Sequence, residues 1–271
     1  MYLFTGTSYG TTYPEVPTPG AYQQKTIFEA MQAAGVTWRY YYQDNSVFLA
    51  SFNAWKDPAI QSNVRDISEY FKILADPNAD ALLPEVVFIE RGSNTADNDE
   101  HPDAGKNLQV GAAAVANMIN SLMSSKAWPT SVFIWSMDEP GGLYDHVPPQ
   151  PMTPPDNQPP SLQSPDGGAT QVIPGDFATT GMRVPFFIVS PFAKPHYVSH
   201  TVRDHTAILK FIEDRFGLKP LTFRDAAQPD MLEFFDFSNP AWLVPPKLPV
   251  QPVFQPVPPA TTVCKEYLES Q

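Results

Sequence analysis

The sequence predicts an α/β protein in which a mostly parallel central sheet has helices on both of its faces. Apolar segments of strand length alternate along the chain with longer segments whose apolar residues recur at helical spacing. Several strand-like segments are apolar on both faces, as strands of buried parallel sheets are. The 271 residues suffice for one large domain or two small ones, and hydrophobic residues make up 42% of them, so a substantial core is available.

The first 130 residues are predicted to form strands and helices in alternation. Strands are expected at residues 1–4, 36–43 and 83–90, and helices at residues 21–35, 63–75 and 106–127. Gly35 would end the first helix, and Ser62 or Asn63 would cap the second. The third helix is the longest, and its predicted core face consists of Leu108, Val115, Ile119, Leu122 and Met123.

The second half contains two further strands, one helix and two proline-rich segments. The strands are expected at residues 131–137 and 183–190, and the helix at residues 201–216. Residues 148–165 and 240–259 each hold 8 prolines, which predicts a long surface loop and an extended tail. We therefore predict one domain over residues 1–242, followed by a proline-rich tail over residues 243–271.

Composition excludes several classes of protein. The net charge of −12 disfavours nucleic-acid binding, which requires lysine and arginine against phosphate. The one cysteine, Cys264, excludes a disulfide within the chain. No apolar run reaches 18 residues, so no membrane-spanning helix is expected. The opening residues have neither a basic region nor a long apolar region, so no signal peptide is expected in this chain.

The most informative segment is the sequence DEPGGLYDHVPP, which follows the predicted strand at residues 131–137. Asp138 and Glu139 lie where this strand ends, and open α/β sheets bind ligands at that edge. Asp145 and His146 add an acid and an imidazole to the same region. Carboxylates with a nearby imidazole suit a hard or borderline divalent metal. The structural alternative is an acidic turn that glycines allow to bend sharply.

A second polar cluster, DNDEHPD, follows the predicted strand at residues 83–90. Its acidic residues are expected to raise the pKa of His101, which favours the imidazolium form. An imidazolium can contact a phosphate oxyanion or act as a general acid. The alternative is a solvated histidine in a loop.

The remaining polar residues carry weaker signals. His200, Asp204 and His205 match no standard zinc spacing, so Asp204 is expected to stabilise a helix start, and His196 and His200 to lie at the surface. The chain has no Walker or HExxH motif. Thr5, Thr7 and Ser8 are expected to line or close the site.

Six motifs follow one another along the chain. This order is LFTGTSYG, WRYYYQD, DNDEHP, DEPGGLYDHVPP, GMRVPFFIVSPF and VRDHTAILKFIEDRFGL. It resembles the bacterial phosphoesterase family of phosphatidylcholine-type phospholipases C and AcpA-like acid phosphatases, from residue 1 to about residue 242. The resemblance implies an alkaline-phosphatase-like three-layer α/β/α fold, hydrolysis of phosphate esters, including phospholipids, through a hydroxyl nucleophile, and a periplasmic or secreted location.

The resemblance also implies roles for individual residues. Asp138 and Glu139 match the paired acidic ligands of a divalent metal whose identity stays open. His101 matches the histidine that contacts the phosphate. Asp145 and His146 match the end of the family's most specific motif and are expected to support catalysis.

The chain departs from the family pattern in one respect. A Glu-Asn metal-binding pair and a GPTxPN-like segment with the nucleophile precede the TGTS segment in the family, whereas this sequence starts at that segment. We therefore expect an N-terminally truncated enzyme with an incomplete metal site and little or no turnover. The alternatives are a sulfatase-like or phosphonate-hydrolase-like enzyme, and a non-catalytic binding module of the same fold.

Overall fold

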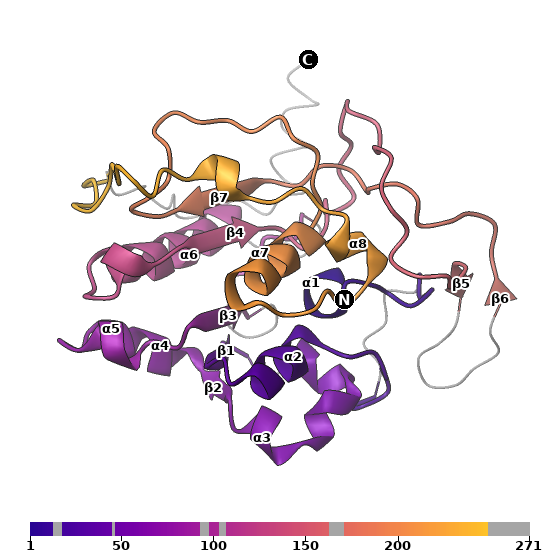
Figure 1. Cartoon of the computed structure of the whole chain (residues 1–271), viewed down its shortest axis with the longest axis horizontal. Helices are drawn as coiled ribbons and strands as arrows, with labels where there is room; N and C mark the ends of the chain where they lie inside the picture. Colours follow the sequence, from indigo (N-terminus) through magenta and orange to yellow (C-terminus); the bar gives the residue numbers. More distant parts are fainter. Residues whose placement is uncertain (13–17, 45–46, 93–97, 103–106, 163–170, 249–271) are drawn as a thin grey trace, which may run out of the picture.

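The computed structural model describes residues 1–12, 18–44, 47–92, 98–102, 107–162 and 171–248. It confirms an α/β protein with a parallel sheet (Figure 1). This sheet has the order β2–β1–β3, in which β1 is Trp38–Tyr42, β2 is Val64–Asp66 and β3 is Val86–Glu90. In register, Tyr40 of β1 lies opposite Val64 and Phe88.

The expectation of one mostly parallel central sheet is wrong for the two later strands. β4 (Phe133–Ser136) pairs antiparallel with β7 (Phe186–Val189) in a separate two-stranded sheet. Parallel pairing needs a crossover, usually a helix, and the described residues between these strands form no helix. The segment instead contains two short antiparallel strands, β5 (Ser161–Leu162) and β6 (Gln171–Val172).

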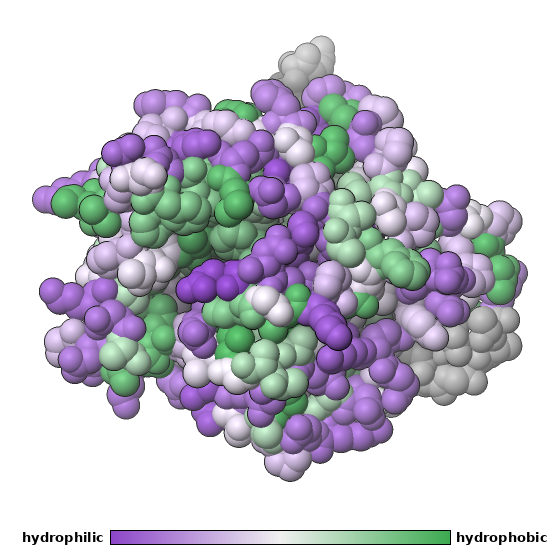
Figure 2. Space-filling view, viewed as in Figure 1, coloured by the Kyte–Doolittle hydropathy of each residue, from purple (hydrophilic) through white to green (hydrophobic). Residues whose placement is uncertain are grey.

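The strand β7 is also more exposed than its apolar sequence predicts. Phe187 stacks on Trp135 of β4 with ring centroids 4.8 Å apart, yet it is 40% exposed. Figure 2 shows apolar side chains at the surface in the region of β7 and the nearby 3₁₀ turn at Leu232–Phe234. The β4–β7 pair therefore lies at the surface of the described structure.

Eight α-helices surround the sheets in the described part of the chain. They are α1 (Tyr2–Thr5), α2 (Ile27–Ala34), α3 (Pro58–Gln61), α4 (Ile67–Leu74), α5 (Ala79–Leu82), α6 (Leu108–Met123), α7 (Thr206–Phe216) and α8 (Phe223–Ala226). Further 3₁₀ turns lie at Phe48–Ser51, Asn53–Lys56 and Trp128–Thr130. None of the helices in these ranges is long and apolar enough to cross a membrane.

Several element boundaries differ from the sequence predictions for local reasons. Residues 1–4 were expected as a strand but belong to a helical turn, which Gly6 ends with a left-handed φ of 71°. α2 begins only at Ile27 because Thr26 and Glu29 form a capping box. The predicted helix at residues 63–75 is divided into β2 and α4, with Asp66 as the N-cap of α4.

Helices α6 and α7 agree better with their predictions. The predicted core face of α6 is buried except for Leu108, which is 49% exposed in the first turn. α7 ends at Gly217, as expected, in a left-handed C-cap. The predicted tail lies largely at residues 249–271, outside the described residues.

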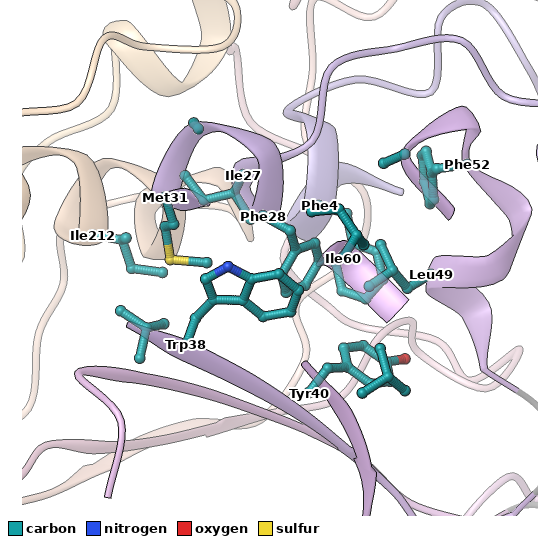
Figure 3. Close-up of a cluster of buried hydrophobic side chains, with 14 of the residues drawn as sticks. Phe4, Ile27, Phe28, Met31, Trp38, Tyr40, Leu49, Phe52, Ile60 and Ile212 are labelled. Carbon is teal, nitrogen blue, oxygen red and sulfur yellow. The ribbon is translucent and has the colours of Figure 1, made fainter. Parts of the chain in front are cut away.

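Alternate residues of β1 reach two apolar clusters on opposite faces of the sheet. Trp38 and Tyr40 pack with Phe28 of α2 and Ile212 of α7 (Figure 3). Tyr41 enters the second cluster, to which α4 and α6 contribute. Helices therefore cover both faces of β1. The carboxyl end of β1 is followed by a polar loop.

Candidate active site

The sequence DEPGG forms a tight turn directly after β4. Asp138 and Glu139 are exposed there, and Gly141 and Gly142 adopt left-handed φ values of 64° and 73°. A Cβ atom at Gly141 would lie 2.6 Å from Cδ of Pro102, so this position requires glycine for both conformation and space. The turn therefore packs directly against the residue that follows His101.

The two acidic clusters predicted from sequence meet at this turn. Nε2 of His101 lies 3.1 Å from Oε1 of Glu139, and both side chains are about half exposed. The backbone N–H of His101 donates to Oδ1 of Asp99 at 2.8 Å, which fixes the loop locally. Arg91 pairs with Glu100 and anchors the same loop to α6 through the carbonyl oxygen of Gly111 at 3.2 Å. Asp97 and Asp103 lie outside the described residues.

Negative charge accumulates at this edge of the structure. Glu90 ends β3 and accepts hydrogen bonds from the hydroxyl of Tyr40 and the backbone N–H of Phe48. Burial raises the pKa of Glu90, and the charge of Asp138 adds to the effect. A bound cation would relieve this repulsion.

The donor chemistry of the turn fits a divalent metal only in part. Within the described residues, no three His, Cys, Asp or Glu side chains gather closely enough to hold a metal ion. Asp138 and Glu139 offer two exposed carboxylates, however, and Mg²⁺ often binds to one or two carboxylates together with water and substrate phosphate. The pair therefore suits a hard cation that shares its ligands with the substrate.

Asp145 braces the loop that follows the turn. Its carboxylate accepts two hydrogen bonds from the Arg183 guanidinium, from Nε at 2.6 Å and from Nη2 at 2.9 Å. These bonds hold the pKa of Asp145 well below its usual range. Nδ1 of His146 lies 3.5 Å from Asp145, and the His146 side chain is 88% exposed. These contacts connect the loop after the turn to Arg183, which precedes β7.

The start of α7 contains a buried ion pair that the sequence analysis missed. Asp204 accepts a hydrogen bond from the backbone N–H of Thr206 at 2.8 Å, which confirms its structural role. Its other oxygen accepts from the buried guanidinium of Arg224 in α8. Arg224 and Asp204 are 20 residues apart and lie in different elements, so no spacing signal indicated this pair.

His205 connects α7 to the acidic turn. Its Nε2–H donates to the carbonyl oxygen of Met137 at 2.8 Å, one residue before Asp138. His196 and His200 are exposed, as expected. The first turn of α7 therefore helps to position the end of β4.

The early hydroxyl residues lie beside the start of α7. The Thr5 hydroxyl donates to the carbonyl oxygen of Thr7 at 2.7 Å, and the Thr7 hydroxyl bonds to Asp156. Ser8 lines a cavity of about 390 Å³ together with Asp204 and His205. Ser8 therefore lines this cavity, whereas the expectation that Thr5, Thr7 and Ser8 line or close the reaction site stays a prediction.

The sequence model of the Phosphoesterase family matches residues 1–219, which include the acidic turn and the loop of His101. The chain belongs to the phosphoesterase family. It is 28% identical over 249 residues to Phospholipase C B of Mycobacterium tuberculosis, covering 84% of this chain and 46% of that protein. It is 32% identical over 247 residues to Non-specific phospholipase C5 of Arabidopsis thaliana, covering 83% of this chain and 44% of that protein.

A third relative aligns with this chain over a similar share of its length. The Hemolytic phospholipase C of Pseudomonas aeruginosa is 29% identical over 266 residues, covering 87% of this chain and 34% of that protein. The chain thus spans less than half the length of these three relatives.

Proposed function

We propose that this protein hydrolyses phosphate esters in the manner of a phospholipase C, with phospholipids among its substrates. Family membership and the names of the three relatives support this reaction class. The observation that carries the proposal is the contact between His101 and Glu139, because it joins two polar loops, 38 residues apart in sequence, at one exposed turn.

In this proposal the residues of the turn have distinct roles. Asp138 and Glu139 would hold a divalent metal, which supplies Lewis-acid polarisation of the phosphoryl oxygens when bound. His101 contacts the phosphate, and its Nε2 lies beside the carboxylate of Glu139. A protonated His101 can stabilise the oxyanion and donate a proton to the leaving oxygen. Gly141 and Gly142 keep side chains away from the approaching ester.

Asp145 and His146 belong to the same proposal as supporting residues. The Asp145–Arg183 pair holds the loop after the turn against the start of β7. His146 projects into solvent, where it is accessible to a bulky substrate. We also propose that the domain of residues 1–242 has the alkaline-phosphatase-like three-layer arrangement and that the protein acts outside the cytoplasm, which cell fractionation would test.

The reaction is tested with p-nitrophenyl phosphate and p-nitrophenylphosphorylcholine in the presence of Mg²⁺, Mn²⁺ or Zn²⁺. We expect Asp138→Asn to abolish metal-dependent turnover. Asp214→Asn is the matched control, because Asp214 is an exposed carboxylate on α7 that pairs only weakly with Lys210. Metal-dependent turnover that persists in Asp138→Asn would contradict the proposal. A folded wild-type chain that turns over neither substrate with any of the metals would match the truncated enzyme or the non-catalytic module expected from the sequence.

A further inference from the structure

Half of the residues that line the cavity beside the start of α7 carry a hydroxyl group. Its volume is about 390 Å³, within the range of about 300–1,000 Å³ that is usual for small-molecule sites. The hydroxyl-bearing residues that line it are Tyr2, Ser8, Thr11, Thr12, Thr179 and Thr180. Phe177 adds an apolar residue to the lining.

Most of the charge in the cavity wall is already paired. The Arg224 guanidinium bonds to Asp204 and donates to the carbonyl oxygens of Phe177 at 2.7 Å and Thr179 at 3.0 Å. Arg224 therefore has little capacity left to bind an anion. Both oxygens of Asp204 are engaged, one by Arg224 and the other by Thr206. The exposed carboxylate of Asp176 also lines the wall, and the backbone N–H of Ala178 donates to it at 2.8 Å. Apart from this carboxylate, the wall offers neutral donors and acceptors rather than a site for a phosphate.

One hydroxyl in the wall lacks a partner. Ser8 is only 7% exposed, and its Oγ makes no hydrogen bond within the described part of the chain. An unpartnered buried hydroxyl is unfavourable, because it has lost its hydrogen bonds to water without gaining others. A ligand hydroxyl in the cavity would supply the missing hydrogen bond.

The cavity adjoins the proposed reaction site. His205 lines the cavity and donates to the carbonyl oxygen of Met137, the residue before Asp138. A group attached to a phosphate at the acidic turn could therefore extend into the cavity.

We propose that this cavity binds a polyol, such as an inositol or a sugar ring, as the head group of the phosphate ester. Hydroxyl groups of a polyol both donate and accept hydrogen bonds, which matches the neutral hydroxyls and carbonyls of the wall. A ring also offers an apolar face to Phe177. The head-group part of this assignment rests on the proposed phosphoesterase function, whereas polyol binding itself does not.

Binding is measured first, by isothermal titration of the protein with myo-inositol and, separately, with choline chloride. We expect myo-inositol to bind and choline to give no signal. Ser8→Ala and Thr179→Val should each weaken inositol binding by about 2- to 10-fold, as expected for the loss of one hydrogen bond. Thr130→Val is the matched control, because Thr130 lies outside the cavity lining, and it should bind like the wild type.

Thermal unfolding distinguishes a ligand contact from a structural role. Ser8→Ala removes an unpartnered hydroxyl, so the ligand-free variant should be as stable as the wild type or more stable. Inositol binding unchanged in both variants, or absent from the wild type, would overturn the assignment.

Turnover then separates the two proposals. Hydrolysis of phosphatidylinositol in preference to phosphatidylcholine, with the preference lost in Thr179→Val, would support the head-group assignment. Inositol binding without turnover of any ester would refute the proposed reaction for this chain and limit the cavity to free polyols. Turnover without inositol binding would overturn the cavity assignment alone.

Discussion

Glu213 makes the stability of the protein depend on pH between pH 4.5 and about 9. This residue of α7 is 2% exposed, and neither of its carboxylate oxygens makes a hydrogen bond within the described residues. The charged groups that face it are the buried Asp225 of α8 and Lys210 of α7. Burial, followed by the neighbouring Asp225, raises the pKa of Glu213 to about 9 from the ordinary value of 4.5.

The sign of the effect follows from proton binding. Between pH 4.5 and about 9 the folded state keeps the proton of Glu213 while the unfolded state has lost it, so stability falls as pH rises. Each pH unit costs about 1.4 kcal/mol, so the wild type loses roughly 3 kcal/mol between pH 4.5 and pH 7 from this group.

The perturbation is Glu213→Gln, which keeps the shape and removes the ionisation. Urea unfolding of both proteins from pH 5 to pH 8.5 gives the difference in free energy of unfolding, in which contributions from the histidines cancel. The variant should gain stability relative to the wild type steadily as pH rises. A difference that stays constant over this range would refute the reasoning, because the carboxyl group would then ionise normally in the folded protein.

Four further substitutions test other parts of the structure. Arg224→Met leaves the largely buried Asp204 without its ion-pair partner and should lower the free energy of unfolding by about 3–5 kcal/mol in urea titrations. Gly141→Ala should destabilise the protein more than Gly142→Ala, because both need a left-handed backbone but only Gly141 would contact Pro102; thermal unfolding measures the difference. Asp145→Asn should make the protein less resistant to acid. The lowered pKa of Asp145 contributes stability above pH 3.8, and this contribution is lost as pH falls through the folded-state value, which acid titration of unfolding by circular dichroism follows.

Local sequence patterns predicted those features that local forces determine. The apolar strand β1, the buried face of α6 and the Gly217 stop of α7 follow from periodicity and capping. The contact between His101 and Glu139 was not itself predicted. The sequence predicted only that two polar clusters each follow a strand. The structure confirms that they lie together, and the catalytic roles of these residues stay a prediction.

Long-range pairing was not predictable in the same way. The sequence of β7 is as apolar as that of a buried parallel strand, so nothing in it indicated antiparallel pairing with β4 at the surface. Residues 1–4 have strand-like composition, yet the left-handed Gly6 closes them into a helical turn. The Arg224–Asp204 pair depends on the packing of α7 and α8, which no single sequence segment specifies.

The most direct test of the proposed site is the turnover of p-nitrophenylphosphorylcholine by His101→Gln compared with His200→Gln, each verified as folded. His200 is an exposed histidine in a loop and serves as the matched control. If His101 contacts the phosphate and protonates the leaving oxygen, its loss should reduce the rate by about 10²- to 10⁴-fold while the control keeps the wild-type rate. Equal rates in an active wild type and both variants would contradict the placement of the reaction at the acidic turn.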